Sequence, residues 1–286
     1  MQLIRCMKRI EVLMSTTKIK SRDEIERKIK DANIITNLSI VNQIEKKGKE
    51  SIIKINESQK MYNLKESGTS KSRNKLLEVT NKDICIFADD DIKYVEKYDE
   101  IILEKYRKYP KADGILFYVE NTNANREKNK KIGNRKLRFL DIMKARIYEL
   151  SLTKEAVQKI KKNNIKFDCN FGPGGIFFKG EDTIFLSDLL KINLDLRCVN
   201  VRIGTVGDTK SSWFKGVNEK YLYDQGAIFY KIAPKMYKVL ILQYVIRKYS
   251  LYKKKVTIKE AYIEMKKGAN FAKRLYNANI DFDVEI

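Results

Sequence analysis

A short apolar run that ends in three consecutive acids constrains the fold of this chain most. Residues 84–88 read ICIFA, and Asp89, Asp90 and Asp91 follow directly. An uncharged run of this length between charged residues is typical of a strand buried on both faces of a sheet. Ligands of open α/β sheets bind beyond the carboxyl ends of the strands, so the acids are expected where a ligand would bind.

The three acids are also a candidate metal site. Adjacent carboxylates repel one another and stay ionised together readily only in water or around a cation. Oxygen ligands favour a hard divalent ion, here Mg²⁺ or Mn²⁺. The chain has no histidine, and its four cysteines show no CxxC spacing, which argues against zinc. The alternative is a solvated acidic turn, which is at least as common for an isolated triplet of acids.

Strand and helix signals alternate through most of the chain. Ser21 resembles the cap of a helix that would run to residue 32, and Pro110 would close another. Such alternation predicts an α/β fold with a mostly parallel, doubly wound sheet. The expected strands are 10–14, 37–43, 51–55, 83–88, 114–119 and an edge strand at 194–204, and the expected helices include 21–32, 98–109 and 150–165.

Polar residues follow the first two expected strands, and a polar loop, described below, precedes the fourth. Ser15, Thr16 and Thr17 end the first strand, and Asn42 and Gln43 end the second. Because parallel strands end at one edge, these side chains are expected to face the same crevice as the acids. Taken singly, polar residues after a strand are ordinary turn chemistry.

Residues 68–74 read GTSKSRN and are expected to form a loop before a short helix. The loop carries Ser70, Arg73 and Asn74. The Arg73 guanidinium can pair with a phosphate through two parallel hydrogen bonds. A surface arginine before a helix is the plainer alternative.

The GTSKSRN segment, the helix after it and the strand ending in ADDD resemble the donor half of bacterial family 2-like glycosyltransferases with the GT-A fold. That family has a Gly-x-Ser-x-x-Arg-Asn loop, a helix and an apolar strand that closes on Asp-x-Asp. The resemblance covers about residues 11–230 and implies a UDP- or GDP-sugar donor. It implies Mg²⁺ or Mn²⁺ on Asp89 and Asp91, and donor contacts from Ser15, Thr16, Thr17, Asn42, Gln43, Ser70, Arg73, Asn74, Asp89 and Asp90.

A second constellation lies at residues 167–190, which read FDCNFGPGGIFFKGEDTIFLSDLL. The glycine-rich part has little side-chain bulk and suits close approach by a substrate. Gly180, Glu181 and Asp182 then open a helix and resemble the family's Glu-Asp acceptor motif, in which the second acid is the catalytic base. The alternative is that Asp182 is only the helix N-cap. A helix N-terminus weakens a carboxylate base, so burial or Glu181 would have to raise the pKa of Asp182.

The segment after the edge strand departs from the family pattern. A histidine that helps to bind the metal often precedes a Ser-Trp pair in these enzymes, and here Asp208 stands near that place, ahead of Trp213. The resemblance therefore makes Asp208 a candidate third metal ligand. Residues 219–230 match the family's closing pattern loosely and receive no chemical role.

The C-terminal part is strongly basic. The chain carries a formal net charge of +22, and residues 231–274 supply half of it, with thirteen Lys or Arg and two Glu. Such charge attracts nucleic acid, a membrane face or phosphorylated substrates. Residues 236–249 are apolar but shorter than the roughly 20 residues of a membrane span. They suit either a membrane interface or an amphipathic helix that packs on the sheet.

The sequence thus predicts a GT-A-like catalytic domain over residues 1–230 and a basic helical appendage over 231–286. The family resemblance implies metal-dependent, inverting transfer of a sugar to a hydroxyl acceptor, such as a lipid-linked glycan, in bacterial surface polysaccharide or lipopolysaccharide synthesis. Arg5, Lys8 and Arg9 interrupt any signal peptide. The expected location is the cytoplasm, with peripheral contact to the inner membrane face through the basic tail.

Two other functions stay open at this point. One is a nucleotidyltransferase-like enzyme that uses a related nucleotide-binding sheet. The other is a non-enzymatic basic module that binds nucleic acid, in which the acids only end a strand. The sequence has no recognisable DNA- or RNA-binding motif, so no nucleic-acid partner is expected.

Overall fold

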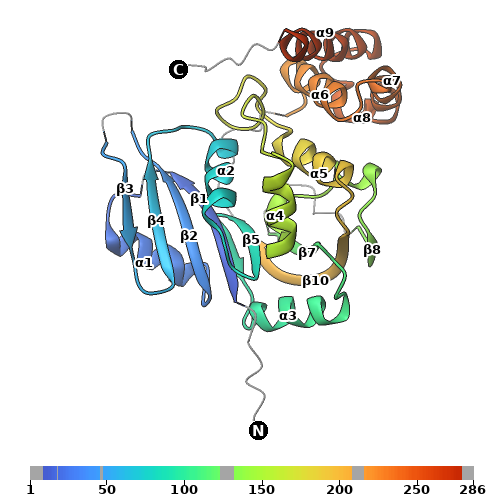
Figure 1. Cartoon of the computed structure of the whole chain (residues 1–286). Helices are drawn as coiled ribbons and strands as arrows, with labels where there is room; N and C mark the ends of the chain where they lie inside the picture. The colour runs from blue at the N-terminus through green and yellow to red at the C-terminus, as the bar shows by residue number, and fades with distance from the viewer. Residues whose placement is uncertain (1–8, 18, 46–47, 123–131, 208–215, 279–286) are drawn as a thin grey trace. The chain divides into compact units, whose positions relative to one another are not determined.

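The computed structural model describes residues 9–17, 19–45, 48–122, 132–207 and 216–278 (Figure 1). The chain divides into two compact units. The first unit comprises Met1–Lys166 and Leu189–Thr209, and the second comprises Phe167–Asp188 and Lys210–Ile286. The predicted boundary at residue 230 differs from this division, because residues 167–188 group with the C-terminal helices.

A single mixed sheet forms the first unit. Among the described residues, ten strands lie in the order β3-β4-β2-β1-β5-β9-β7-β10-β6, and β8 pairs with β10. Six of these described strands, β4, β2, β1, β5, β7 and β10, run in the same direction, as the mostly parallel prediction requires. The bounds are β1 (Ile10–Thr17), β2 (Asn37–Gln43), β3 (Ser51–Lys54), β4 (Gln59–Leu64), β5 (Ile84–Asp89), β6 (Ile92–Tyr94), β7 (Gly114–Asn121), β8 (Arg135–Lys136), β9 (Leu150–Thr153) and β10 (Leu196–Val206).

Helices cover both faces of this sheet. Side chains of α1 (Arg22–Asp31) and α3 (Tyr98–Lys108) share one apolar cluster with Val12, Met14 and Ile86. On the other face, α2 (Thr69–Val79) lies against β1 and β2, and α4 (Lys154–Lys162) lies against β9 (Figure 1). Burial on both faces explains why the central strands are uninterrupted apolar runs. Two short 3₁₀ helices occupy Phe139–Asp141 and Ile147–Glu149.

The predicted N-cap of α1 is present. The Ser21 hydroxyl accepts a hydrogen bond from the Glu24 backbone N–H at 3.2 Å, which confirms the predicted start of α1. The Glu24 carboxylate accepts the N–H of Lys20 at 3.1 Å. The first bond satisfies a backbone donor that the helix leaves unpaired at its N-terminus, and the second holds the residue before the cap.

The structure corrects the predictions for the helix at 150–165 and for the edge strand at 194–204. The expected helix at 150–165 begins only at Lys154, and the preceding four residues form β9, which lies antiparallel between β5 and β7. The Thr153 hydroxyl then caps α4 by accepting the Ala156 N–H at 3.1 Å. The strand expected at the edge of the sheet, β10, has β7 on one side and β6 and β8 on the other.

The second unit is helical. It contains most of α5 (Glu181–Lys191), together with α6 (Glu219–Ile232), α7 (Tyr237–Arg247), α8 (Tyr249–Tyr252) and α9 (Ile258–Asn277). Helices α6 and α9 pack with their backbones in contact. A Cβ atom on Gly226 would lie 1.8 Å from the Met265 carbonyl oxygen, and one on Gly268 would lie 1.9 Å from that of Tyr223. Only glycine permits this approach. Within the described residues, no helix combines the length and the apolar character needed to cross a bilayer.

Candidate functional site

The predicted strand ends do meet at one edge of the sheet. Ser15 of β1 lies opposite Asp89 of β5 in the parallel register. On the other side of β1, Thr16 lies opposite Asn42, and Thr17 lies opposite Gln43. Three of the expected donor-binding segments are therefore neighbours, as the sheet topology requires of a ligand site in this class of fold.

Asp89, Asp90 and Asp91, called the acid cluster below, lie half-buried beyond this edge. Asp89 Oδ1 accepts a hydrogen bond from Arg73 Nη2 at 3.0 Å. Asp90 Oδ2 accepts bonds from Thr16 Oγ1 at 2.6 Å and from Lys28 Nζ at 3.1 Å. Two cations thus offset the repulsion that three adjacent carboxylates create.

Arg73 is positioned by α2 rather than by a loop. The helix begins at Thr69, so the prediction that residues 68–74 form a loop was wrong, and Ser70, Arg73 and Asn74 lie in its first two turns. Gly68 precedes the helix with φ of 122°, a conformation that favours glycine, and its N–H donates to Gln43 Oε1 at 2.7 Å. The Arg73 side chain is only 5% exposed, so its guanidinium approaches the acid cluster from below the surface.

Asn42 has a structural task at this edge. Its side chain is fully buried, and Oδ1 accepts the Ile19 N–H at 3.0 Å. Nδ2 donates to the Ile19 carbonyl at 3.0 Å and to Asn63 Oδ1 at 2.8 Å. Both amide hydrogens are thereby used, so Asn42 fixes the chain that follows β1. Ser15 is half-buried and Thr17 is exposed, whereas Thr16 is buried.

The metal prediction can be examined in part. Within the described residues, no three Asp, Glu, Cys or His side chains group closely enough to hold an ion. Asp208 lies outside the described residues. The preceding residue, Gly207, donates its N–H to the Asp91 carbonyl at 3.4 Å, which places the end of β10 beside the acid cluster. Mg²⁺ commonly uses one or two carboxylates with substrate phosphates, so the oxygen ligands of Asp89 and Asp91 fit such an ion.

Glu181 and Asp182 belong to the second unit, where they are the first two residues of α5. The alternative in which Asp182 is the N-cap was wrong. Gly180 precedes the helix with φ of 110°, and its carbonyl accepts the Ile184 N–H at 2.9 Å. Asp182 is half-buried in the first turn, where the helix dipole stabilises a carboxylate.

Residues 172–175, called the glycine loop below, allow close packing around Glu181. A Cβ atom on Gly172 would lie 2.8 Å from the Glu181 carboxyl carbon, and Gly172 also has φ of 90°. A Cβ atom on Gly175 would meet the Asn170 carbonyl oxygen at 2.7 Å. One on Gly180 would lie 2.4 Å from Ile228 Cγ1 of α6. The loop and the start of α5 therefore depend on the absence of side chains at these glycines.

Sequence reasoning missed the residues of α6 that hold the segment after the glycine loop. Asp224, 2% exposed, accepts the Phe178 N–H at 3.1 Å and a hydrogen bond from Lys220. Lys220 Nζ also donates to the Ile176 carbonyl at 3.0 Å. Burial raises the pKa of Asp224, and the bond from Lys220 opposes that rise. The signal in the sequence was a Lys-Asp pair four residues apart on a helix that is otherwise largely apolar.

Lys179 extends this network. Its Nζ donates to Gln225 Oε1 at 2.8 Å and lies 3.1 Å from the centre of the Tyr221 ring. A cation over an aromatic face is attracted by the ring electrons. Ile176, Phe178 and Lys179 thus fasten the segment between the glycine loop and α5 to α6.

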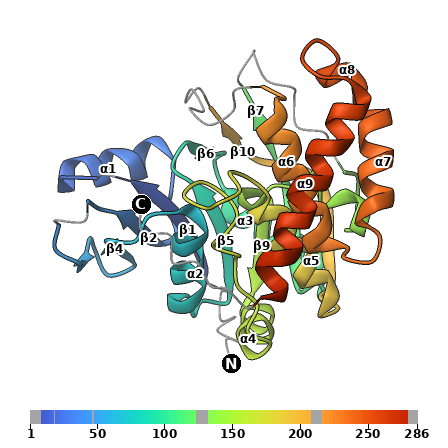
Figure 2. The same ribbon diagram turned by 90° about the horizontal axis from the view of Figure 1, so that it is seen from above.

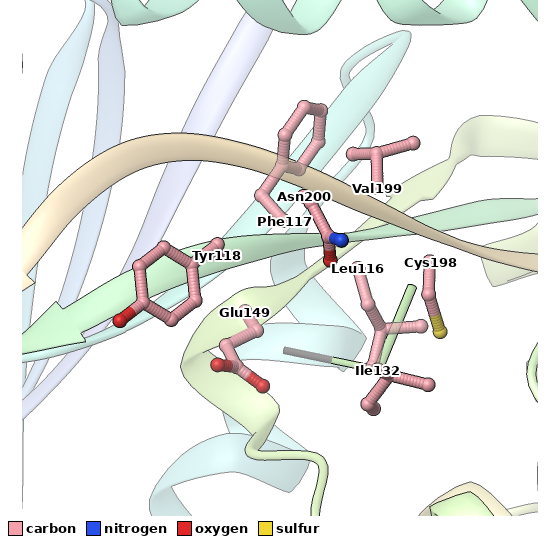
Figure 3. A pocket seen from close by; sticks show the side chains of 8 residues that line it. All are labelled: Leu116, Phe117, Tyr118, Ile132, Glu149, Cys198, Val199 and Asn200. Carbon is pink, nitrogen blue, oxygen red and sulfur yellow. The ribbon is translucent and has the colours of Figure 1, made fainter. Parts of the chain in front are cut away.

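A small pocket lies elsewhere in the first unit, between β7, β10 and the segment before β9 (Figure 3). Its volume of about 20 Å³ suits roughly one water molecule, not a nucleotide. Burial raises the pKa of the Cys198 thiol to about 12. None of the predicted site residues lines it. The lining residues are Leu116, Phe117, Tyr118, Ile132, Glu149, Cys198, Val199 and Asn200.

No protein-family model matches the chain, and no curated protein sequence matches it either. Solved structures do match. The structure of S. aureus TarS 1-349 in complex with UDP is 12% identical, with a TM-score of 0.59, and the match covers 97% of this chain and 94% of that chain. The complex of the same protein with UDP-GlcNAc is also 12% identical, with a TM-score of 0.58 and coverage of 96% and 93%. A longer TarS structure matches with a TM-score of 0.56 and 12% identity, over 95% of this chain and 54% of that chain. These matches confirm the predicted fold class, a GT-A-like α/β sheet with a C-terminal helical appendage.

Proposed function

We propose that this chain is a glycosyltransferase that moves a sugar from a nucleotide-diphosphate donor to a hydroxyl acceptor. The observation that carries the proposal is the meeting of the acid cluster with the ends of β1 and β2 at one edge of the sheet. The motif resemblance and the fold shared with TarS, which was solved with UDP and with UDP-GlcNAc, support it.

In this proposal the first unit binds the donor. Ser15, Thr17 and Gln43 provide polar groups for the nucleoside, and the buried Asn42 and Thr16 hold the surrounding chain and Asp90 in place. Arg73 orients Asp89 and adds positive potential for the diphosphate. Mg²⁺ or Mn²⁺ held by Asp89 and Asp91, with Asp208 as a further candidate ligand, would neutralise charge on the departing nucleotide.

Asp182 is the proposed base. Asp182 takes the proton from the acceptor hydroxyl while that oxygen attacks the anomeric carbon, and the nucleoside diphosphate leaves with the electrons of the broken bond. A single displacement inverts the anomeric carbon. Glu181, which packs against Gly172 of the glycine loop, would lie beside the bound acceptor. A surface polysaccharide or lipopolysaccharide precursor remains the proposed acceptor class.

A thermal-shift panel of nucleoside diphosphates, with and without Mn²⁺, tests donor binding. We expect UDP or GDP to raise the melting temperature only when Mn²⁺ is present, because the phosphates and the acids share the ion. Asp91→Asn should lose this shift. Asp99→Asn, a half-buried acid at the start of α3, is the matched control and should keep it.

The same panel separates the alternatives. A larger shift with nucleoside triphosphates than with diphosphates would favour the nucleotidyltransferase. Stabilisation by oligonucleotides that falls steeply with salt would favour the nucleic-acid-binding module. If no nucleoside diphosphate gives a shift in the presence of Mn²⁺, the proposed donor site is wrong.

A further inference from the structure

One face of α7 in the second unit is apolar and exposed. The helix packs through Ile241, Tyr244 and Val245, which are buried. The opposite face presents side chains spaced three or four residues apart, which places them along one side of the helix. These exposed side chains are Met236 (58% exposed), Val239 (59%), Leu242 (53%) and Ile246 (61%), and the row continues with Tyr249 (40%) and Leu251 (52%) of α8.

This row, called the α7 stripe below, is more than scattered surface hydrophobicity. Helices α6, α9 and α7 pack side by side (Figure 2). The buried Tyr244 ring of α7 lies 5.6 Å from the Phe229 ring of α6, so the buried side of α7 faces its neighbours. An ordinary amphipathic helix would place charged residues on the side away from its neighbours. A contiguous exposed apolar row of this kind usually marks an interaction surface.

The chain segment that carries the stripe has charge of one sign. From residue 225 to residue 259 the chain holds nine Lys or Arg and no Asp or Glu. Lys238 and Arg247 of α7 are exposed, as are Lys253, Lys254 and Lys255 after α8. Exposed bases therefore accompany the apolar row along its whole length. Any partner must accept apolar side chains and offer negative charge in the same place.

We propose that the α7 stripe and its bases dock on the surface of an anionic lipid bilayer. An anionic bilayer provides both requirements, since acyl chains accept the apolar side chains and lipid headgroups pair with the bases. A second copy of this chain would bring two basic surfaces together. Nucleic acid would leave the apolar side chains without a partner. At about 16 Å, a helix of this length is too short to cross the roughly 30 Å hydrocarbon layer and would lie in its surface.

Vesicle co-sedimentation of the full chain tests the proposal. We expect binding to vesicles in which about a third of the lipid is phosphatidylglycerol, and little binding to pure phosphatidylcholine. The triple variant Val239→Ser, Leu242→Ser and Ile246→Ser should bind the anionic vesicles about tenfold more weakly. A second triple variant, Lys253→Gln, Lys254→Gln and Lys255→Gln, should show a comparable loss that added salt reproduces in the parent protein.

Ile52→Ser is the matched control, because Ile52 is 68% exposed on β3 of the first unit and should not contribute. Circular dichroism of each variant checks that the helices persist. Binding of the parent chain to neither vesicle type, or unchanged binding by the α7 triple variant, would overturn the proposal. So would a concentration-dependent dimer that the α7 triple variant abolishes, or RNA binding that only the lysine variant loses. The assay contains no nucleotide or sugar, so its failure leaves the proposed transferase activity untested and intact.

Discussion

The acid cluster and the glycine loop are both candidate ligand sites, but they are built by opposite means. In the first unit, Asp89 and Asp90 are held by charged partners, Arg73 and Lys28, at the ends of strands whose register brings them together. In the second unit, Gly172 and Gly180 lack side chains, which lets Glu181 and Ile228 pack directly against the backbone. The first site should therefore respond to changes of charge, and the second to changes of volume.

The largest expected effect is on sugar transfer, and it distinguishes the proposed base from the donor-binding residues. Asp182→Asn should reduce sugar transfer by about 10²–10⁴-fold, because the base that accepts the hydroxyl proton is lost. Mn²⁺-dependent nucleotide binding should remain, since the acid cluster is unchanged. Transfer assays with radiolabelled donor and the thermal-shift panel measure the two quantities. Asp188→Asn, further along α5, is the control, and undiminished transfer by Asp182→Asn would refute the assignment.

The positions of most strands and of the acids could be predicted from the sequence. The contacts that build the two sites could not. The apolar runs of β1, β2, β5 and β7 and the acids after β5 were predictable because strand burial and a terminal charge are local signals. Strand β9 was not, since its residues LSLT adjoin an amphipathic helix and read as its first turn. The three-residue β6 and the polar β4 gave no periodic signal.

Side-chain roles were less predictable than positions. Asn42 lies where the sequence placed it, yet its amide bonds to Ile19 depend on how the chain returns after β1, which no local pattern specifies. Asp224 received no role because its partner Phe178 lies 46 residues earlier in the sequence. The same holds for Lys220, whose partner is the Ile176 carbonyl.

The next-largest effect tests the close packing of α6 against α9 in the second unit. Gly226→Ala should destabilise the protein by about 3 kcal/mol, because the new Cβ would clash with the Met265 carbonyl and force α6 and α9 apart. Alanine normally stabilises a helix interior relative to glycine, so the sign itself is informative. Gly207→Ala is the control, with its nearest neighbour at 3.8 Å, and should be near neutral. Urea denaturation measures both, and a stabilised Gly226→Ala would contradict the packing described.

A smaller effect tests the ion pair between Arg73 and Asp89 in the first unit. Arg73→Met keeps much of the side-chain volume but removes the partner of Asp89, whose side chain is 36% exposed. We expect a loss of about 1–2 kcal/mol in unfolding free energy and weaker UDP or GDP binding, since partial exposure lets water replace some of the lost interaction. Arg22→Met, at a 65% exposed side chain, should change neither quantity. Isothermal titration and urea denaturation measure them; unaltered nucleotide affinity in Arg73→Met would limit Arg73 to a structural role.

The smallest effect concerns the cysteines. Burial raises the pKa of Cys85 and of Cys198 in the first unit to about 12, whereas Cys169 next to the glycine loop is exposed. Because the thiolate is the reactive form, at pH 8 only Cys169 should react quickly with a thiol reagent in a Cys6→Ser background. The other two should react only after unfolding. Cys169→Ser should remove the fast phase and change stability by less than about 0.5 kcal/mol. A persistent fast phase would mean that the sheet core opens readily.

Strand β9 has a consequence for how this protein is made. Its four buried residues pair with β5 on one side and with β7 on the other, and both of these strands come earlier in the chain. Ser151 Oγ of β9 also donates to the Ile115 carbonyl of β7 at 3.0 Å. Until the ribosome has released residues 150–153, the nascent chain exposes an open apolar edge on β5 and has no neighbour for β7. Exposed strand edges of this kind recruit other chains, so the interval before β9 emerges is when a chaperone would protect the growing polypeptide most.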